Sequence, residues 1–289
     1  NVQLGPGVCL ARVPLNGRNF EYISGEDPFL GATLVGPAVK GIQSQGVIAN
    51  AKHWVDNNQE THRGWVSAQV DERTQFEMYY PPFEAAIKAG AHLSLLPCAL
   101  RVGSIMCSYN KIGGVYSCEK SSSLLRDLKG RLGFKGWVMS DWGATHSSSI
   151  NEGLDQAAPF HSELQFHMQS SRIDPCVQEE ELARAQEMPG ETYMGDKLAA
   201  LVAAGNVSIA KVDESAGRIL TAMFATGLFD NPNNNSPENN VTSEEHNKIA
   251  QGTPRLLVFS ILLSHPPSSP LVLSFLCLEA LPPSACDVL

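Results

Sequence analysis

The sequence lacks the features that mark several large protein classes. Its 289 residues carry a formal net charge of −9, with 21 basic and 30 acidic residues, and no basic stripe of the kind that binds nucleic acid. No apolar run reaches the roughly 18 residues of a membrane span. The seven cysteines form no CxxC pair, and the glycines form neither GxGxxG nor a phosphate loop. We therefore expect no nucleic acid, membrane, zinc or nucleotide partner, and no cofactor.

The histidines and cysteines allow two narrower expectations. His161 and His167 are too far apart for one helical face and have no supporting Cys/His cluster, so we predict no metal site. Cys107 and Cys118 are close enough in sequence to close a short loop by a disulfide if the protein is secreted. Glycosylation sequons at Asn206 and Asn240 suit secretion, although no signal peptide is visible in the chain.

The apolar segments predict an α/β fold. Four short runs are apolar in their first half and end in polar residues, as strands buried on both faces of a parallel sheet do; they cover residues 1–8, 46–54, 103–110 and 136–142. Helical spacing of apolar residues follows each run. The expected helices cover residues 28–46, 71–90, 121–134, 196–206 and 208–229. Repeated strand–helix units favour a parallel sheet with helical connections.

Two of these helices carry more detailed predictions. Asp71 is expected to cap the second helix, which Pro81 and Pro82 should break in two. In the last helix one face collects six apolar residues that we expect to pack on the core. They are Val212, Ala216, Ile219, Leu220, Met223 and Phe224.

Three predicted strands end in reactive side chains, where α/β folds bind their ligands. These ends carry Lys52-His53, Tyr109-Asn110 and Asp141-Trp142. An ionised Asp141 could attack carbon, hold a metal or act as a base, or it could simply cap a following helix. Trp142 could stack on a sugar ring or fill the core. Lys52 and His53 offer donors for hydroxyl groups or an anion, or they could lie on the surface.

Two loops near these strands are rich in polar groups. In the segment 15–29, Arg18, Glu21, Glu26 and Asp27 could form ion pairs or line a cleft. The segment 57–63, "NNQETHR", could bind hydroxyls with its amides or satisfy its own backbone.

Five segments in a fixed order carry a resemblance to a known family. They are "LNGRNFEYISGEDPFLGA", "AKHWVDNNQETHR", "MCSYNKIGGVYSC", "GWVMSDWGATHS" and "EMPGETYMGDKL". Together they resemble the β-glucosidases of glycoside hydrolase family 3, of fungal or oomycete type, over about residues 1–247.

The resemblance implies a TIM-barrel-like (β/α) domain in which Asp141 is the nucleophile of a retaining glycosidase. It implies a β-glucoside or oligosaccharide substrate, cellobiose-like, and an extracellular location. The residues it implies for sugar binding are Arg18, Lys52, His53, Met106, Tyr109 and Trp142.

The chain also departs from the family pattern. The first barrel strands are expected before Asn1, so the barrel is predicted to be incomplete at its N-terminus. Residues 91–101 and 157–186 read as insertions in a catalytic domain over 1–249. Residues 250–289 form an apolar, Ser/Pro-rich tail, which we expect to be disordered, in place of the second α/β sandwich domain. Because the family's acid/base carboxylate comes from that second domain, we expect impaired activity.

Two other interpretations stay open. The chain could be an inactive carbohydrate-binding remnant or a mispredicted gene product with retained introns or a frameshift. It could also be a different barrel enzyme, such as a Schiff-base aldolase using Lys52. The oligomeric state is not predicted.

Overall fold

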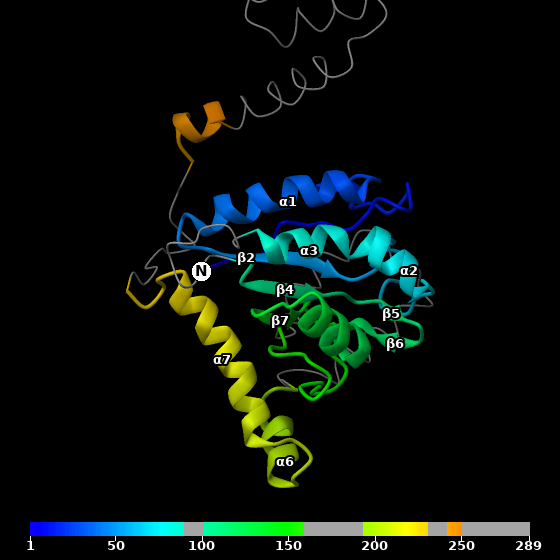
Figure 1. Cartoon of the computed structure of the whole chain (residues 1–289), viewed down its shortest axis with the longest axis vertical. Coiled ribbons are helices and arrows are strands. Elements are labelled where there is room, and N and C mark those ends of the chain that lie inside the picture. The colour runs from blue at the N-terminus through cyan, green and yellow to red at the C-terminus, as the bar shows by residue number, and fades with distance from the viewer. Residues whose placement is uncertain (90–100, 159–192, 231–241, 250–289) are drawn as a thin grey trace, which may run out of the picture. The chain divides into compact units, whose positions relative to one another are not determined.

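The computed structural model describes residues 1–89, 101–158, 193–230 and 242–249 (Figure 1). The predicted insertions, the tail and the His161–His167 pair fall almost entirely outside these residues. The chain divides into two compact units, Asn1–Asn233 and Asn234–Leu289. In the second unit residues 244–249 are helical. The domain boundary predicted after residue 249 stays a prediction.

Four parallel strands form the main sheet of the first unit (Figure 1). In spatial order they are β1 (Val2–Gln3), β2 (Ile48–Trp54), β4 (Ser104–Cys107) and β7 (Trp137–Ser140). Every residue of β4 and β7 is buried, and so is every residue of β2 except the half-buried Lys52. The predicted parallel sheet is confirmed, and three of its strands are buried on both faces, whereas in β1 Val2 is half-buried and Gln3 is exposed.

The first strand is shorter than predicted. Only Val2–Gln3 pairs regularly with β2, because the backbone turns at Gly5, whose N–H bonds to Gln3 O at 2.8 Å. The chain then returns to the sheet at Gly7, which forms isolated bridges with Lys52 and Tyr22. This return brings the loop after residue 10 close to the end of β2.

A smaller sheet, absent from our prediction, lies beyond the ends of β2 and β4. Its order is β3 (Ser67–Ala68), β5 (Lys111–Ile112) and β6 (Val115–Tyr116). β3 pairs parallel with β5, and β5 pairs antiparallel with β6.

Helix α1 (Pro28–Gln43) begins and packs as its sequence dictates. Asp27 accepts a hydrogen bond from Phe29 N at 2.8 Å, and Pro28 occupies the first helical position, where its missing N–H costs nothing. The residues of its buried face are four apart: Gly31, Val35, Val39 and Gln43. In Figure 1 this helix lies beside α3 (Pro81–Lys88), and both pack on β2.

The second predicted helix is capped and broken where we expected. Asp71 accepts from Thr74 N at 3.0 Å and caps α2 (Glu72–Thr74), which continues as the π-helical turn η2 (Gln75–Tyr79). A new helix, α3, starts at Pro81. The shorter turns are η1 (Asn19–Glu21) and η3 (Ser117–Glu119), and the predicted helix at 121–134 is the π-type helix η4 (Ser122–Arg131).

The last two described helices of the first unit are α6 (Asp196–Ala203) and α7 (Ile209–Ala225). The face predicted for α7 is wrong at three positions, because Ala216 is exposed, Leu220 is 45% exposed and Phe224 is 64% exposed. Ser215 and Ala222 are the buried residues of the helix instead. Their small side chains let α7 approach β7, and a Cβ on Gly103 would already lie 3.4 Å from Ala222.

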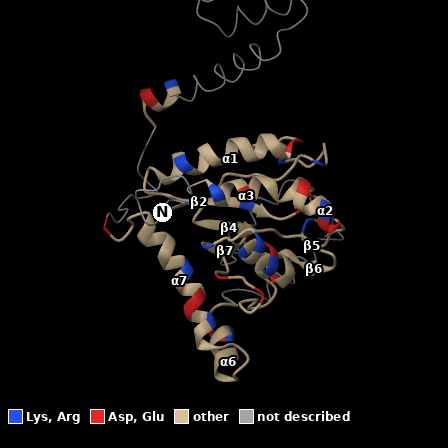
Figure 2. Cartoon of the chain, viewed as in Figure 1, with Lys and Arg blue, Asp and Glu red and all other residues tan. Residues whose placement is uncertain are grey.

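Charged residues of both signs are interspersed over the described helices (Figure 2). On α7, for example, Glu214 pairs with Lys211 at 2.9 Å and with Arg218 at 3.0 Å. The part of the chain that the structure describes shows no basic stripe, and none of its helices is long and apolar enough to cross a membrane.

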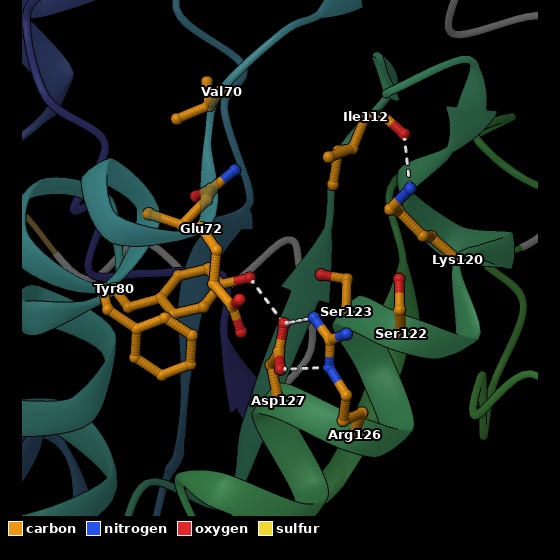
Figure 3. Close-up of a pocket in the computed structure, with 11 residues that line it drawn as sticks. Val70, Glu72, Tyr80, Ile112, Lys120, Ser122, Ser123, Arg126 and Asp127 are labelled. Carbon is orange, nitrogen blue, oxygen red and sulfur yellow. Dashed lines mark hydrogen bonds and ion pairs between the residues drawn. The ribbon is translucent and has the colours of Figure 1, made fainter.

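A pocket of about 130 Å³ lies between the α2–η2 segment and η4 (Figure 3). At its base the Tyr80 phenol donates to Asp127 Oδ2 at 3.1 Å, and Arg126 binds the same carboxylate through two nitrogens at 2.8 and 3.0 Å. No residue that lines it is among those predicted to bind sugar.

The predicted disulfide between Cys107 and Cys118 is present and joins the end of β4 to η3. Replacing both residues by serine should lower the free energy of unfolding by about 3 kcal/mol, because the open loop gives the unfolded chain more freedom. Urea denaturation measures this change. A reducing agent should weaken the native chain by a similar amount and leave the double variant unchanged. Equal urea midpoints for the native chain and the double variant would contradict this prediction.

Candidate active site

The candidate site lies at the carboxyl ends of three neighbouring strands. Lys52 and His53 lie near the end of β2, Tyr109 follows β4, and Asp141 directly follows β7. The pairing register of β2 with β4 shifts between Lys52 and Trp54, so this strand end is irregular. Asp141 N donates to Cys107 O at 3.2 Å and continues the ladder one step beyond β7. The apolar run of β7 therefore ends with a carboxylate fixed at the edge of the sheet.

Three donors surround the Asp141 carboxylate. His53 Nε2 lies 3.1 Å from Oδ2, the Tyr109 hydroxyl lies 3.0 Å from Oδ1, and Trp142 N donates to Oδ1 at 2.8 Å. Asp141 is only 8% exposed. Burial alone would raise its pKa, but the hydrogen bonds from His53, Trp142 N and Tyr109 hold the pKa below the ordinary 3.8. The carboxylate is therefore ionised at neutral pH.

The two side chains beside Asp141 are neutral. Burial lowers the pKa of His53 and outweighs the opposing effect of Asp141. Burial and the nearby Asp141 charge both raise the pKa of Tyr109. The single phenolic hydrogen of Tyr109 is shared between Asp141 Oδ1 and Trp142 O, the latter at 2.8 Å. Arg63 lies over the Tyr109 ring, 4.0 Å from its centroid.

Arg18 and Lys52 are held together by Glu21. Arg18 Nε donates to Glu21 Oε2 at 2.7 Å, and Lys52 Nζ lies 2.7 Å from Glu21 Oε1. Burial would raise the pKa of Glu21, but the bonds from Arg18 and Lys52 lower it to about 2. The positive charges of Arg18 and Lys52 also lower the pKa of His53, so both cations are close enough to interact with its ring. The ion-pair alternative for Arg18 and Glu21 is the one observed, whereas Asp27 caps α1.

Met106 and Trp142 lie on the apolar side of the site. Met106 is aligned with Lys52 and Met139 across the sheet and is 2% exposed. Trp142 is half-buried and packs against the cluster that contains Met106. Their contact with a sugar stays a prediction.

Three residues for which no role was predicted complete this arrangement: Tyr22, Glu60 and Arg63. The Tyr22 hydroxyl lies 3.1 Å from His53 Nδ1. Glu60 pairs with Arg63 at 2.6 Å and lies 3.7 Å from Arg18. The i,i+3 spacing of Glu60 and Arg63 could have predicted their ion pair, whereas nothing in the local sequence indicated a role for Tyr22. Within the described segments no group of three His, Cys, Asp or Glu side chains could hold a metal ion.

The chain resembles known proteins over most of its length. A probable β-glucosidase L from Emericella nidulans is 38% identical over 262 residues, which are 87% of this chain and 31% of that protein. β-Glucosidase BoGH3A from Bacteroides ovatus is 34% identical, over 86% of this chain and 30% of its own length. This chain thus spans about a third of the length of these curated relatives.

Solved structures show the same likeness. DesR, a β-glucosidase from Streptomyces venezuelae in complex with D-glucose, is 34% identical with a TM-score of 0.67, over 88% of this chain and 28% of its own. β-Glucosidase 3B from Thermotoga neapolitana in complex with α-D-glucose is 31% identical with a TM-score of 0.67. This match covers 88% of this chain and 31% of that protein. These matches confirm a TIM-barrel-like α/β fold. The glycosyl hydrolase family 3 N-terminal domain matches residues 1–222, and the chain belongs to glycoside hydrolase family 3.

Proposed function

We propose that this chain carries the nucleophile and sugar-binding half of a retaining β-glucosidase, with Asp141 as the nucleophile. The observation that supports this role best is an ionised carboxylate, nearly buried at the end of a barrel strand, with neutral donors on both oxygens. Family membership agrees with this role.

Hydrogen bonding suggests which oxygen attacks. Asp141 Oδ1 accepts from Tyr109 and Trp142 N, whereas Oδ2 accepts from His53 alone among the residues that the structure describes. Oδ2 therefore keeps a free lone pair. Its attack forms a bond to the anomeric carbon while the bond to the aglycone oxygen breaks and that oxygen leaves with the electron pair. Water then hydrolyses the glycosyl ester.

The cations beside Asp141 suit sugar hydroxyls. Arg18 and Lys52 each keep N–H donors beyond those bound to Glu21. Fixed by that shared carboxylate, they reach the substrate without the entropy cost of ordering free side chains. We assign them to sugar binding with His53, Tyr109, Met106 and Trp142.

A retaining glycosidase also needs a second carboxyl group about 5–5.5 Å from the first, to donate a proton to the aglycone. Glu21 is unsuited, because its two cations keep it ionised, and Glu60 is bound by Arg63 and Arg18. We infer that neither site glutamate is the acid/base and that activity is impaired without one. A carbohydrate-binding protein without turnover is the alternative.

The remaining expectations fit this assignment. Lys52 Nζ is committed to an ion pair with Glu21, which does not favour Schiff-base chemistry. We propose a terminal β-glucosyl residue as the substrate unit and an extracellular location, since a disulfide persists in oxidising compartments.

Two aryl β-glucosides test this function. A dinitrophenyl leaving group departs without a proton, whereas a phenyl leaving group needs one. We expect the chain to release dinitrophenol and to be about 10²–10⁴-fold slower on the phenyl glucoside than proton-assisted enzymes are. Absorbance of the released phenols measures both. Efficient phenyl release would place the acid within this chain, and no release from either, with glucose still bound, would support the non-catalytic alternative.

A further inference from the structure

Tyr22 lies behind His53, on the side away from the nucleophile. Its hydroxyl is 3.1 Å from His53 Nδ1, while His53 Nε2 faces Asp141 Oδ2 at the same distance. Tyr22 is 5% exposed and His53 is 1% exposed. The imidazole therefore bridges a phenol and a carboxylate, with both ring nitrogens engaged.

The chemistry of the three groups fixes the position of each proton. An ionised carboxylate only accepts, so Nε2 must carry the imidazole hydrogen. A neutral imidazole has one hydrogen, which leaves Nδ1 as an acceptor. Burial raises the pKa of Tyr22, so the phenol keeps its proton and can donate it. The chain of donors runs from Tyr22 through His53 to Asp141.

We propose that Tyr22 is a positioning residue for the reaction: by donating to His53 Nδ1 it holds the imidazole so that Nε2–H points at the attacking carboxylate. This proposal rests on the proposed function of Asp141. Among the described residues, the other hydrogen bonds of His53 involve its backbone: Cys9 Sγ lies 3.3 Å from its carbonyl oxygen and 3.4 Å from its nitrogen. Neither contact restrains the rotation of the ring. Among the described side chains, the phenol is the polar group that engages Nδ1.

The hydrogen bond from Tyr22 to His53 matters most after Asp141 has attacked the sugar. When Asp141 becomes a glycosyl ester it loses its negative charge, and its hold on Nε2–H weakens. Tyr22 is unchanged by that step and continues to satisfy Nδ1. The imidazole therefore keeps one orientation through both halves of the reaction.

Nitrogen-15 NMR of histidine in the full chain tests the proton assignment without depending on activity. We expect Nε2 of His53 to be protonated and the Nδ1 signal to be displaced as in a hydrogen-bonded acceptor. Tyr22→Phe should move Nδ1 to the position of a bare acceptor. A fluorotyrosine at position 22, a stronger donor of similar size, should move it the opposite way. A proton on Nδ1, or an Nδ1 signal that is the same in all three proteins, overturns the proposal.

Covalent labelling by a 2-fluoro-glucosyl fluoride supplies a second readout. Tyr22→Phe keeps the ring and its contact with Arg18, so the variant should fold and be labelled roughly tenfold more slowly. Tyr80→Phe is the matched control, because it too loses one buried phenol bond, to Asp127 outside the site. Both variants should melt at lower temperature, but only Tyr22→Phe should slow labelling. Equal slowing by both variants, or no slowing by Tyr22→Phe, refutes the positioning role of Tyr22. If the native chain is not labelled at all, Asp141 is not the nucleophile, and the NMR result remains a separate test of the hydrogen bond.

Discussion

Asp141→Asn should abolish covalent labelling of the chain by a 2-fluoro-glucosyl fluoride. The fluoride leaves without a proton, so the experiment needs the nucleophile and no acid/base. Asparagine keeps an oxygen for Trp142 N but has no ionised oxygen to attack carbon. We expect the labelling rate, followed by intact-protein mass spectrometry, to fall by about 10⁴-fold or more, the scale on which removal of a catalytic residue acts.

Asp127→Asn is the matched control for this experiment. Asp127 is also a buried aspartate that accepts from a tyrosine hydroxyl and a cation, but it lies at the base of the separate pocket between η2 and η4 (Figure 3). We expect this variant to be labelled at the native rate. If Asp141→Asn reacted as fast as the native chain, or if peptide mapping placed the label on another carboxylate, Asp141 would not be the nucleophile.

Lys129→Met should destabilise the fold more than any other single change we consider. Lys129 Nζ lies 2.7 Å from Asp155 Oδ2, and their side chains are 5% and 0% exposed. Burial lowers the pKa of Lys129 to about 8, which shows how poorly solvated the pair is. Without the cation, Asp155 becomes a buried, uncompensated charge, so the free energy of unfolding should fall by 3–5 kcal/mol, measured by urea denaturation.

Asp155 also joins three elements, which explains the size of the effect. It accepts from Val138 N in β7 at 2.8 Å and from the Ser215 hydroxyl in α7 at 2.9 Å, while Lys129 comes from η4. The double variant Lys129→Met/Asp155→Asn removes the charge and keeps an acceptor, so it should recover much of the loss. Lys88→Met, which breaks an exposed pair with Glu84, should change stability by no more than about 1 kcal/mol. Similar losses in Lys129→Met and Lys88→Met would show that the buried pair is not a major stabilising contact.

Features that depend on near neighbours along the chain could be predicted from the sequence. Asp27 and Asp71 cap their helices because a capping carboxylate bonds a backbone N–H two or three residues away. Pro81 starts a new helix because its ring has no N–H to continue the old one. The apolar run before Asp141 forms a buried strand and delivers the carboxylate to its end.

Contacts between side chains that are far apart in the sequence depend on the packed fold and could not be predicted. Tyr22 and His53 are 31 positions apart, as are Glu21 and Lys52, and their contacts depend on how the chain re-enters the sheet at Gly7. The buried stripe of α7 was likewise set by close approach to β7 rather than by hydrophobicity, which left Leu220 and Phe224 exposed. The periodicity of a helix or strand specifies which residues share a face. Which other element packs against that face is decided only when the chain folds.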